Sequence, residues 1–154
     1  MATTNTDRIE KKILLRAPRA RVWRALTDAE EFCSWFGIKL EGTIEPGARV
    51  KGMILHPQFA DVPFEITIDR MERERLFSWR WHPNAIERGR DYSSEPTTLI
   101  VFELEEVPGG TMLKLVESGF DGIPLSRRAE AYRGNEGGWT IQMENIERHV
   151  SKAA

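Results

Sequence analysis

Between residues 38 and 118 the hydrophobic side chains of this chain recur at every second position. Phe64, Ile66 and Ile68, for example, are each followed by a polar residue. Such alternation is typical of strands with one face in a core and the other in water. The pattern predicts an early strand at residues 9–16 and six more at 38–44, 49–55, 64–69, 76–81, 100–105 and 111–118.

Helical spacing replaces the alternation between residues 18 and 37. Pro18 suits the first turn of a short helix, and an apolar stripe follows it. The segment from Thr27 to Glu30 has the pattern of a capping box, so we expect Thr27 to begin a second short helix. Gly37 is placed to end that helix.

The C-terminal residues predict a long helix with one weak region. Trp139, Met143, Ile146 and Val150 lie at helical spacing and form one apolar face. Three glycines fall within residues 134–138, and each one costs a helix roughly 1 kcal/mol relative to alanine. We therefore expect a loosened joint at 134–138, between a first helical part at 125–133 and a firm helix to about residue 150.

The order of these elements predicts an α+β protein. Six consecutive strands with short turns favour an antiparallel meander, and their alternation requires one packed face and one wet face. We predict a curved sheet of about seven antiparallel strands around the long C-terminal helix, with two short helices after the first strand. We interpret residues 1–154 as a single domain and expect residues 1–7 to be disordered.

Charge and composition exclude some partners. The formal net charge is −2 and the pI is about 6.0, so no basic surface is available for nucleic acid. No run of 18 apolar residues could span a membrane, and the polar first residues do not resemble a signal peptide. Cys33 is the single cysteine, which excludes an internal disulfide and suits the cytoplasm.

Three groups of residues, in chain order, resemble a known superfamily. They are the segment 18–27 (PRARVWRALT) with Trp35-Phe36, then Phe77-Ser78-Trp79, and then Gly110-Thr111, the segment 117–120 (ESGF) and Gly138-Trp139. The chain resembles the helix-grip superfamily of START-like and pollen-allergen-like proteins (SRPBCC). Within it, the chain is most similar to the subfamily related to the C-terminal domain of the activator of heat-shock protein 90 ATPase.

That resemblance implies a cavity between the sheet and the long helix, and it leaves three hypotheses for function. The first, which we favour, is a non-enzymatic protein that binds a small apolar or aromatic molecule. The second is a cyclase- or hydrolase-type enzyme acting in the same cavity, although the superfamily has no shared catalytic motif from which to assign residues. The third is a co-chaperone-like interaction module. Co-chaperones of this kind resemble two-domain proteins, and 154 residues leave no room for the other domain, so we rank a chaperone partner below a small molecule.

Strand parity and helical spacing predict which side chains face the cavity. The chain has five tryptophans, and their rings either fill a large aromatic core or line a ligand site. Both readings stay open at this stage. The residues expected to contact a ligand are Trp35, Phe64, Ile66, Trp79, Trp81, Phe102, Leu113, Leu115, Glu117, Trp139 and Met143.

Glu117 is the most informative polar residue in that set. Its parity matches Leu113 and Leu115, so we expect its side chain to point toward the packed face of the sheet. A carboxylate there needs a partner. We expect either an arginine or solvent at the open end of the strand, or a role as a polar anchor for a ligand hydroxyl or amine.

Other candidate chemistry is sparse. His56, His82 and His149 are dispersed, and the chain has no HExxH, paired CxxC or GxSxG motif, so we expect no metal, no cofactor and no catalytic residue. Cys33 is interpreted as a buried, inert thiol. The direction of His56 depends on whether Ile54 or its neighbours face inward. We interpret the arginines at the start of the long helix as a solvated face: Arg127, Arg128 and Arg133.

Overall fold

The alternating segments form one seven-stranded antiparallel sheet in the computed structural model, which describes residues 7–57, 62–86 and 89–151. The strand order is β1-β7-β6-β5-β4-β3-β2, so strands β2 to β7 follow one another as a meander and β1 pairs with β7. The strands are β1 (Arg8–Leu15), β2 (Ile38–Glu41), β3 (Arg49–Ile54), β4 (Pro63–Glu72), β5 (Leu76–Trp81), β6 (Thr98–Val107) and β7 (Gly110–Ser118). The predicted meander and the α+β fold class are confirmed. Of the residues expected to be disordered, 1–6 lie outside the described part of the chain.

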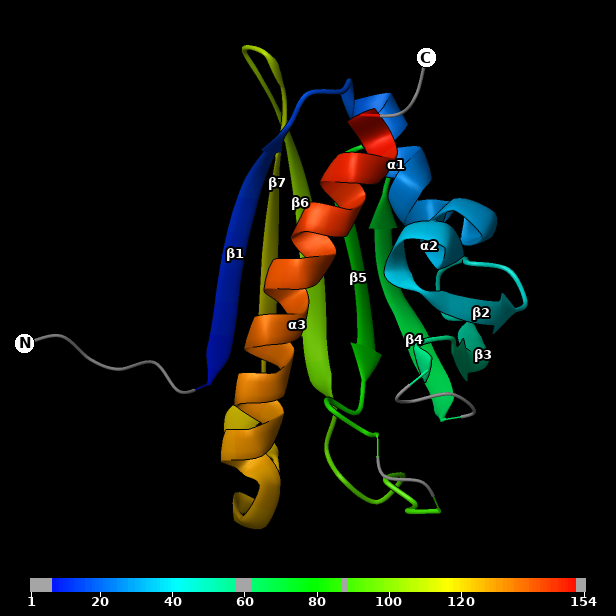
Figure 1. Cartoon of the computed structure of the whole chain (residues 1–154), viewed down its shortest axis with the longest axis vertical. Helices are drawn as coiled ribbons and strands as arrows, with labels where there is room; N and C mark the ends of the chain where they lie inside the picture. Colours follow the sequence, from blue (N-terminus) through cyan, green and yellow to red (C-terminus); the bar gives the residue numbers. More distant parts are fainter. Residues whose placement is uncertain (1–6, 58–61, 87–88, 152–154) are drawn as a thin grey trace, which may run out of the picture.

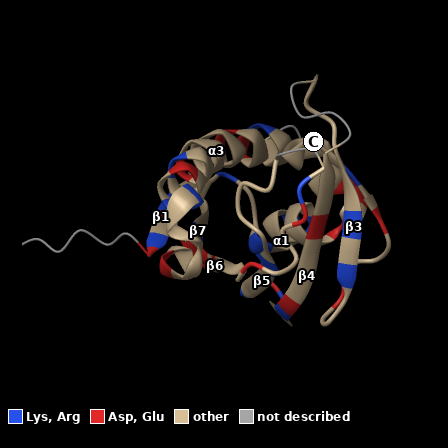
Figure 2. Ribbon diagram, turned by 90° about the horizontal axis from the view of Figure 1, so that it is seen from below, with Lys and Arg blue, Asp and Glu red and all other residues tan. Residues whose placement is uncertain are grey.

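Helices cover one face of this sheet. They are α1 (Arg19–Thr27), α2 (Ala29–Phe36), the short 3-10 helix η2 (Phe120–Gly122) and the long α3 (Leu125–Ser151). Figure 1 shows α3 running across the sheet, with α1 and α2 beside its C-terminal half. In the view from below (Figure 2), the sheet curves from β1 to β3, and α3 lies across the open side of that curve. This is the helix-grip arrangement that the order of elements predicted.

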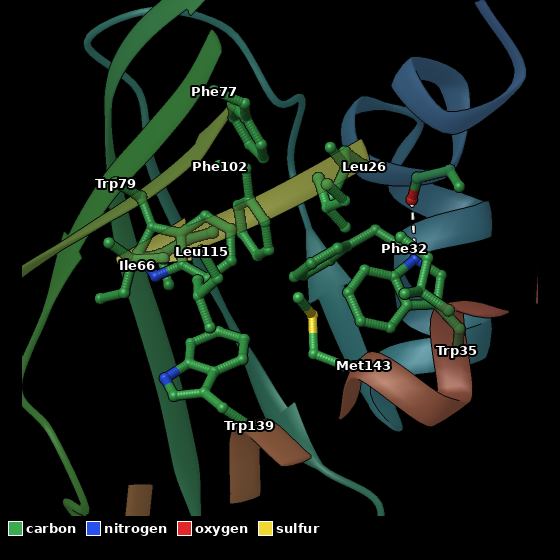
Figure 3. Packing of buried hydrophobic residues seen from close by; sticks show 14 of the residues in the cluster. Leu26, Phe32, Trp35, Ile66, Phe77, Trp79, Phe102, Leu115, Trp139 and Met143 are labelled. Atoms are coloured by element: carbon green, nitrogen blue, oxygen red, sulfur yellow. Dashed lines mark hydrogen bonds between the residues drawn. The ribbon is translucent and has the colours of Figure 1, made fainter. Parts of the chain in front are cut away.

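The core lies between the concave face of the sheet and the helices. Leu113, Leu115 and Glu117 of β7 are all buried, as their shared parity predicted. Figure 3 shows the aromatic centre of this core, where rings from the sheet meet residues of α2 and α3. Trp79 lies there with no exposed surface. On β3, Ile54 is half-buried whereas Met53 and Leu55 are exposed, so Ile54 is the residue of this strand end that faces inward.

The start of α2 differs from the predicted capping box. Asp28 is the N-cap, and its Oδ1 accepts a hydrogen bond of 3.1 Å from the backbone N–H of Glu31. Thr27 instead ends α1, where its hydroxyl donates to the carbonyl oxygen of Trp23. The cap therefore lies one residue later than predicted, because aspartate caps as well as threonine does. Gly37 ends α2 in a left-handed conformation (φ 83°), as expected.

The expected joint at residues 134–138 is wrong. Helix α3 is continuous over 27 residues and includes all three glycines of that segment. Ala131 on one side of the segment and Trp139, Met143 and Ile146 on the other are buried against the sheet. Tertiary packing of this kind supplies most helix stability in proteins and outweighs a weak local propensity.

The start of α3 is partly buried, which differs from the solvated face that the sequence predicted. Arg127 is buried, and its Nε donates to Glu95 Oε1 over 2.8 Å. Glu95 belongs to the irregular segment that joins β5 to β6. Pro83 of the same segment is buried, and its carbonyl oxygen accepts a 2.9 Å hydrogen bond from Arg127 Nη1. The segment is therefore held to α3 by hydrogen bonds and an ion pair.

Candidate functional site

A cleft of about 1110 Å³ lies beside the middle of α3 and is open to solvent. Its walls come from the end of α2, the adjoining ends of β3, β4 and β5, the segment after β5, and residues 134–145 of α3. The volume lies slightly above the usual range for small-molecule sites, roughly 300–1,000 Å³. The space is therefore large enough for a molecule with several fused rings.

The floor of the cleft is aromatic. Phe36, Phe64, Trp81 and Trp139 line it, and their rings contact one another in a closed series. The ring centroids are 5.8 Å apart for Phe36–Phe64, 5.9 Å for Phe64–Trp81, 5.7 Å for Trp81–Trp139 and 6.0 Å for Phe36–Trp139. Trp79 lies behind them in the core and contacts both other tryptophans. Mutual packing of this kind fixes the rings, so the floor is a preformed apolar surface.

The α3 wall combines glycines with amide side chains. Gly134 and Gly138 line the cleft together with Asn135, Gln142 and Asn145. A Cβ added at Gly138 would meet no atom within 4 Å, so the space beside this residue is open. The absence of a side chain at Gly138 widens the cleft where the helix passes the aromatic floor, whereas beside Gly134 the side chain of Asn84 takes the space that a Cβ would need.

Glu117 lies beneath the cleft with no exposed surface. Its Oε1 accepts hydrogen bonds from Trp139 Nε1 (2.8 Å) and Asn135 Nδ2 (2.9 Å). Its Oε2 accepts from Trp81 Nε1 (2.8 Å), Thr98 Oγ1 (2.6 Å) and again Asn135 Nδ2 (3.0 Å). The carboxylate thus joins β5, β6 and β7 to α3 directly behind the aromatic floor.

The expected arginine or solvent partner of Glu117 is therefore wrong. Within the described residues its hydrogen-bond partners are neutral groups, and every one of them donates. Two of the donors are indole N–H groups, which cannot accept a hydrogen bond and so match an acceptor-only carboxylate. The sequence did indicate that Trp81, by its strand parity, and Trp139, by its helical spacing, face the same interior as Glu117. It gave no such indication for Asn135, which lies within the glycine-rich segment.

The residues expected to contact a ligand divide into two groups. Trp35, Phe64, Trp81 and Trp139 line the cleft, although only Trp81 of these four is half-buried and the other three belong to the buried core at its edge. The others are buried in the core around it, as Figure 3 shows for several of them: Ile66, Trp79, Phe102, Leu113, Leu115, Glu117 and Met143. Ligand contact by either group stays a prediction. The reasoning from sequence missed Phe36 and the polar lining from α3 and the segment after β5, because that lining has no periodic pattern.

The ion pair between Arg127 and Glu95 holds the segment after β5 along one side of the cleft. The Arg127 guanidinium carbon lies 4.9 Å from the centre of the Tyr92 ring, and Tyr92 also lines the cleft. The hydrogen bond from Arg127 is the main cause that lowers the pKa of Glu95 below its ordinary value, and burial opposes it. This side of the cleft is therefore stabilised by charge, while its floor is stabilised by apolar packing.

A family profile described as Activator of Hsp90 ATPase homolog 1-like protein matches residues 16–151. The chain belongs to this family. Glu117 and all of the described cleft-lining residues fall within the matched region. No curated protein matches the chain.

Solved structures share the fold of this family member. Protein MLL2253 of Mesorhizobium loti is 21% identical over 96% of this chain and 98% of that one, with a TM-score of 0.76. A protein of Arthrobacter aurescens is 15% identical over 99% and 91%, with a TM-score of 0.78. DynU16, from the dynemicin biosynthetic locus, is 23% identical with a TM-score of 0.72, but this chain covers only 48% of it. At these identities the similarity shows the fold alone.

Other chemistry finds little support in the described residues. They contain no group of three or more His, Cys, Asp and Glu side chains placed to hold a metal ion. Cys33 is half-buried, and burial raises the pKa of its thiol, which disfavours the reactive thiolate. No helix in the described part of the chain is both long and apolar enough to cross a membrane.

Proposed function

We propose that the protein binds a small apolar or aromatic molecule in the cleft between the sheet and α3. The observation that carries the proposal is the preformed aromatic floor formed by Phe36, Phe64, Trp81 and Trp139, open to solvent through a cleft of about 1110 Å³. Binding a ligand over apolar surface of this kind removes that surface from water, which favours the complex by roughly 25 cal/mol per Å² buried. The lone cysteine supports a cytoplasmic setting as part of the same proposal.

The family supports binding more than catalysis. Proteins of this fold family commonly bind apolar ligands, and the cleft supplies what such binding needs. Acid–base catalysis requires a titratable group within reach of the substrate. Glu117, the carboxylate bonded to both indoles of the aromatic floor, has no exposed surface, and neutral donors occupy both of its oxygens. We therefore infer a structural role for Glu117 and rank an enzyme, which would have to use other titratable residues of the lining such as His56, Glu65, His82 or Asp91, below a binder.

A co-chaperone role would use a different part of the molecule. It requires an exposed apolar patch that a protein partner could cover. Among the exposed large apolar side chains, Leu14, Met53 and Leu125 lie outside the cleft lining, whereas Leu55 and Ile141, which are 58% and 59% exposed, belong to it. Their position beside the aromatic floor favours contact with the ligand proposed here.

The proposal is tested by filling the cleft at Gly138. In Gly138→Leu the new Cβ meets no atom within 4 Å, so the side chain starts in open space beside the floor and takes volume that a ligand would need. Gly137→Leu is the matched control, because Gly137 is exposed and a Cβ there also meets no atom within 4 Å. Both changes raise helix propensity by roughly 0.8–1 kcal/mol, so neither should destabilise α3. Trp139→Ala is a poorer choice, since Trp139 donates to Glu117.

The measurement is a fluorescence titration with N-phenyl-1-naphthylamine, a neutral apolar probe. We expect the original protein and Gly137→Leu to bind it at micromolar affinity, near −8 kcal/mol. Gly138→Leu should bind at least about tenfold more weakly, a loss of about 1.4 kcal/mol or more. Absence of binding to the original protein, or equal binding by the two leucine variants, would contradict the proposal.

A further inference from the structure

Glu117 has no remaining capacity to bind a ligand directly. A carboxylate offers about four lone-pair positions. Trp81, Thr98, Asn135 and Trp139 already approach its two oxygens at 2.6–3.0 Å. A ligand that bonded to Glu117 would have to displace one of these donors. The polar contact offered to a ligand must therefore come from a neighbour.

Asn135 is that neighbour, because Glu117 orients its amide. Nδ2 of Asn135 lies 2.9 and 3.0 Å from the two carboxylate oxygens. The opposite orientation would place the carbonyl oxygen against a carboxylate, where both groups can only accept. Oδ1 of Asn135 is therefore turned away from Glu117, on a half-buried side chain that lines the cleft.

The other two amides of this wall are already engaged. Gln142 Nε2 donates to the carbonyl oxygen of Phe36 (2.9 Å), and its Oε1 accepts from Asn145 Nδ2 (3.0 Å). Asn145 Oδ1 in turn accepts from Arg148 (2.6 Å). Among the side chains and backbone groups that the structure describes, none donates to Oδ1 of Asn135. This oxygen is a preoriented acceptor at the edge of the aromatic floor.

We infer that the ligand is an apolar ring system carrying a hydroxyl or N–H group that donates to Oδ1 of Asn135. The inference rests on the proposed function and narrows its ligand class. The carboxylate of Glu117 polarises the amide through the Nδ2–H hydrogen bond, and linked hydrogen bonds of this kind strengthen one another. The same negative charge disfavours a ligand whose polar group is a carboxylate or phosphate. Alcohols, phenols and amines therefore fit this position better than free fatty acids do, and the two described arginines that line the cleft, Arg49 and Arg90, are already paired with Glu65 and Glu95.

The test compares two probes that differ only in the donor. 9-Hydroxyphenanthrene has the O–H group, and 9-methoxyphenanthrene replaces its hydrogen with a methyl group. Both are titrated by fluorescence against the original protein and against Asn135→Leu, which removes the acceptor and keeps a similar volume. Asn135→Ala serves as a second variant in case the leucine does not pack. Circular dichroism checks that each variant is folded.

The informative quantity is the ratio of the two dissociation constants, methoxy over hydroxy. Since the methyl group alters transfer from water equally for every variant, a fall in the ratio reports the loss of the acceptor at residue 135. A rise in the ratio would show that the hydroxy probe donates instead to the Glu117 oxygens that Asn135 leaves free, and would contradict the inference. We expect the ratio to fall by about fivefold in Asn135→Leu and Asn135→Ala, on the scale of one neutral hydrogen bond. Affinity for the methoxy probe should stay within about twofold, because the apolar floor is unchanged.

The outcomes separate this inference from the proposed function. If both probes bind and the ratio is the same in the original protein and both variants, Asn135 is not the acceptor, and the proposal of an apolar site still stands. If neither phenanthrene nor N-phenyl-1-naphthylamine binds, the proposed function fails and this inference fails with it. A tighter complex with phenanthrene-9-carboxylate than with the hydroxy probe would also overturn the ligand class.

Discussion

Replacing Glu117 with glutamine should destabilise the fold even though the side chain keeps its shape. Every described partner of Glu117 donates a hydrogen bond, and the amide converts one acceptor oxygen into a donor NH₂ group. With the NH₂ at the Oε1 position it faces the indole N–H of Trp139, and at Oε2 it faces that of Trp81. Asn135 can turn its amide and Thr98 can rotate its hydroxyl, but an indole N–H cannot accept. Either orientation therefore leaves one indole donor without its acceptor.

The size of the effect follows from that count. A buried donor left without a partner costs roughly 1–3 kcal/mol. The remaining hydrogen bonds also lose their charge assistance, while the amide no longer requires a charge to be buried, and these two changes oppose each other. We expect a net loss of about 2 kcal/mol in the free energy of unfolding. For a domain of this size that corresponds to a fall of about 4–8 °C in Tm.

The assay is urea unfolding followed by circular dichroism, with Tm from a thermal scan. Glu105→Gln is the matched control, because Glu105 lies exposed on β6 and its change should stay within about 0.5 kcal/mol. If Glu117→Gln is as stable as the original protein, or more stable, the carboxylate is not what satisfies the two indoles. The account of the polar cluster behind the cleft would then be wrong.

Three further predictions concern side chains whose pKa the fold shifts, namely Glu31, Cys33 and Glu95. Burial raises the pKa of Glu31, but hydrogen bonds from His149 and two arginines outweigh it and hold this pKa below its ordinary value. Glu31 therefore stabilises the fold above its unfolded pKa, and this contribution is lost as the pH falls through its folded pKa. When urea unfolding is measured across the acid range, the stability of Glu31→Gln should converge with that of the original protein at low pH. A difference in stability that stays constant with pH would contradict this. Because burial raises the pKa of Cys33, iodoacetamide should modify its thiol slowly at pH 7 in the folded protein and much faster in urea. An equally fast reaction in the folded protein would show that burial does not suppress the thiolate. Glu95→Gln should weaken the bond to Arg127 and increase hydrogen exchange in the segment between β5 and β6 but not in the sheet. Unchanged exchange in that segment would show that the bond between Glu95 and Arg127 does not hold it in place.

Much of the fold was predictable because each strand has one buried face. Alternation along β4 and β7 reports which side chains point inward, and it predicted the burial of Glu117 beside Leu115. The long apolar face of α3 likewise predicted where that helix packs. The weaker local signals failed where packing opposed them, as in the expected joint at residues 134–138. A glycine lowers helix propensity only slightly, and tertiary contacts on both sides of the segment outweighed that effect.

The composition of the site was less predictable, because it depends on contacts between distant segments. The partners of Glu117 come from the end of β5, the start of β6 and the middle of α3, which share no periodic pattern. Arg127 and Glu95 meet through an irregular segment for the same reason. Such pairings depend on strand register and helix rotation, which hydrophobic spacing constrains only coarsely.

The most direct test of the central claim, that the aromatic cleft holds the ligand, is a titration of the indole N–H signals by ¹⁵N NMR. The five tryptophans provide one reporter each, and the probe is N-phenyl-1-naphthylamine. We expect the signals of Trp35, Trp81 and Trp139, which line the cleft, to shift together as the probe is added. Trp23 packs on Phe77 outside the cleft lining, so its signal should stay in place. Shifts confined to Trp23, or no shift of the three cleft indoles at saturating probe, would contradict the account.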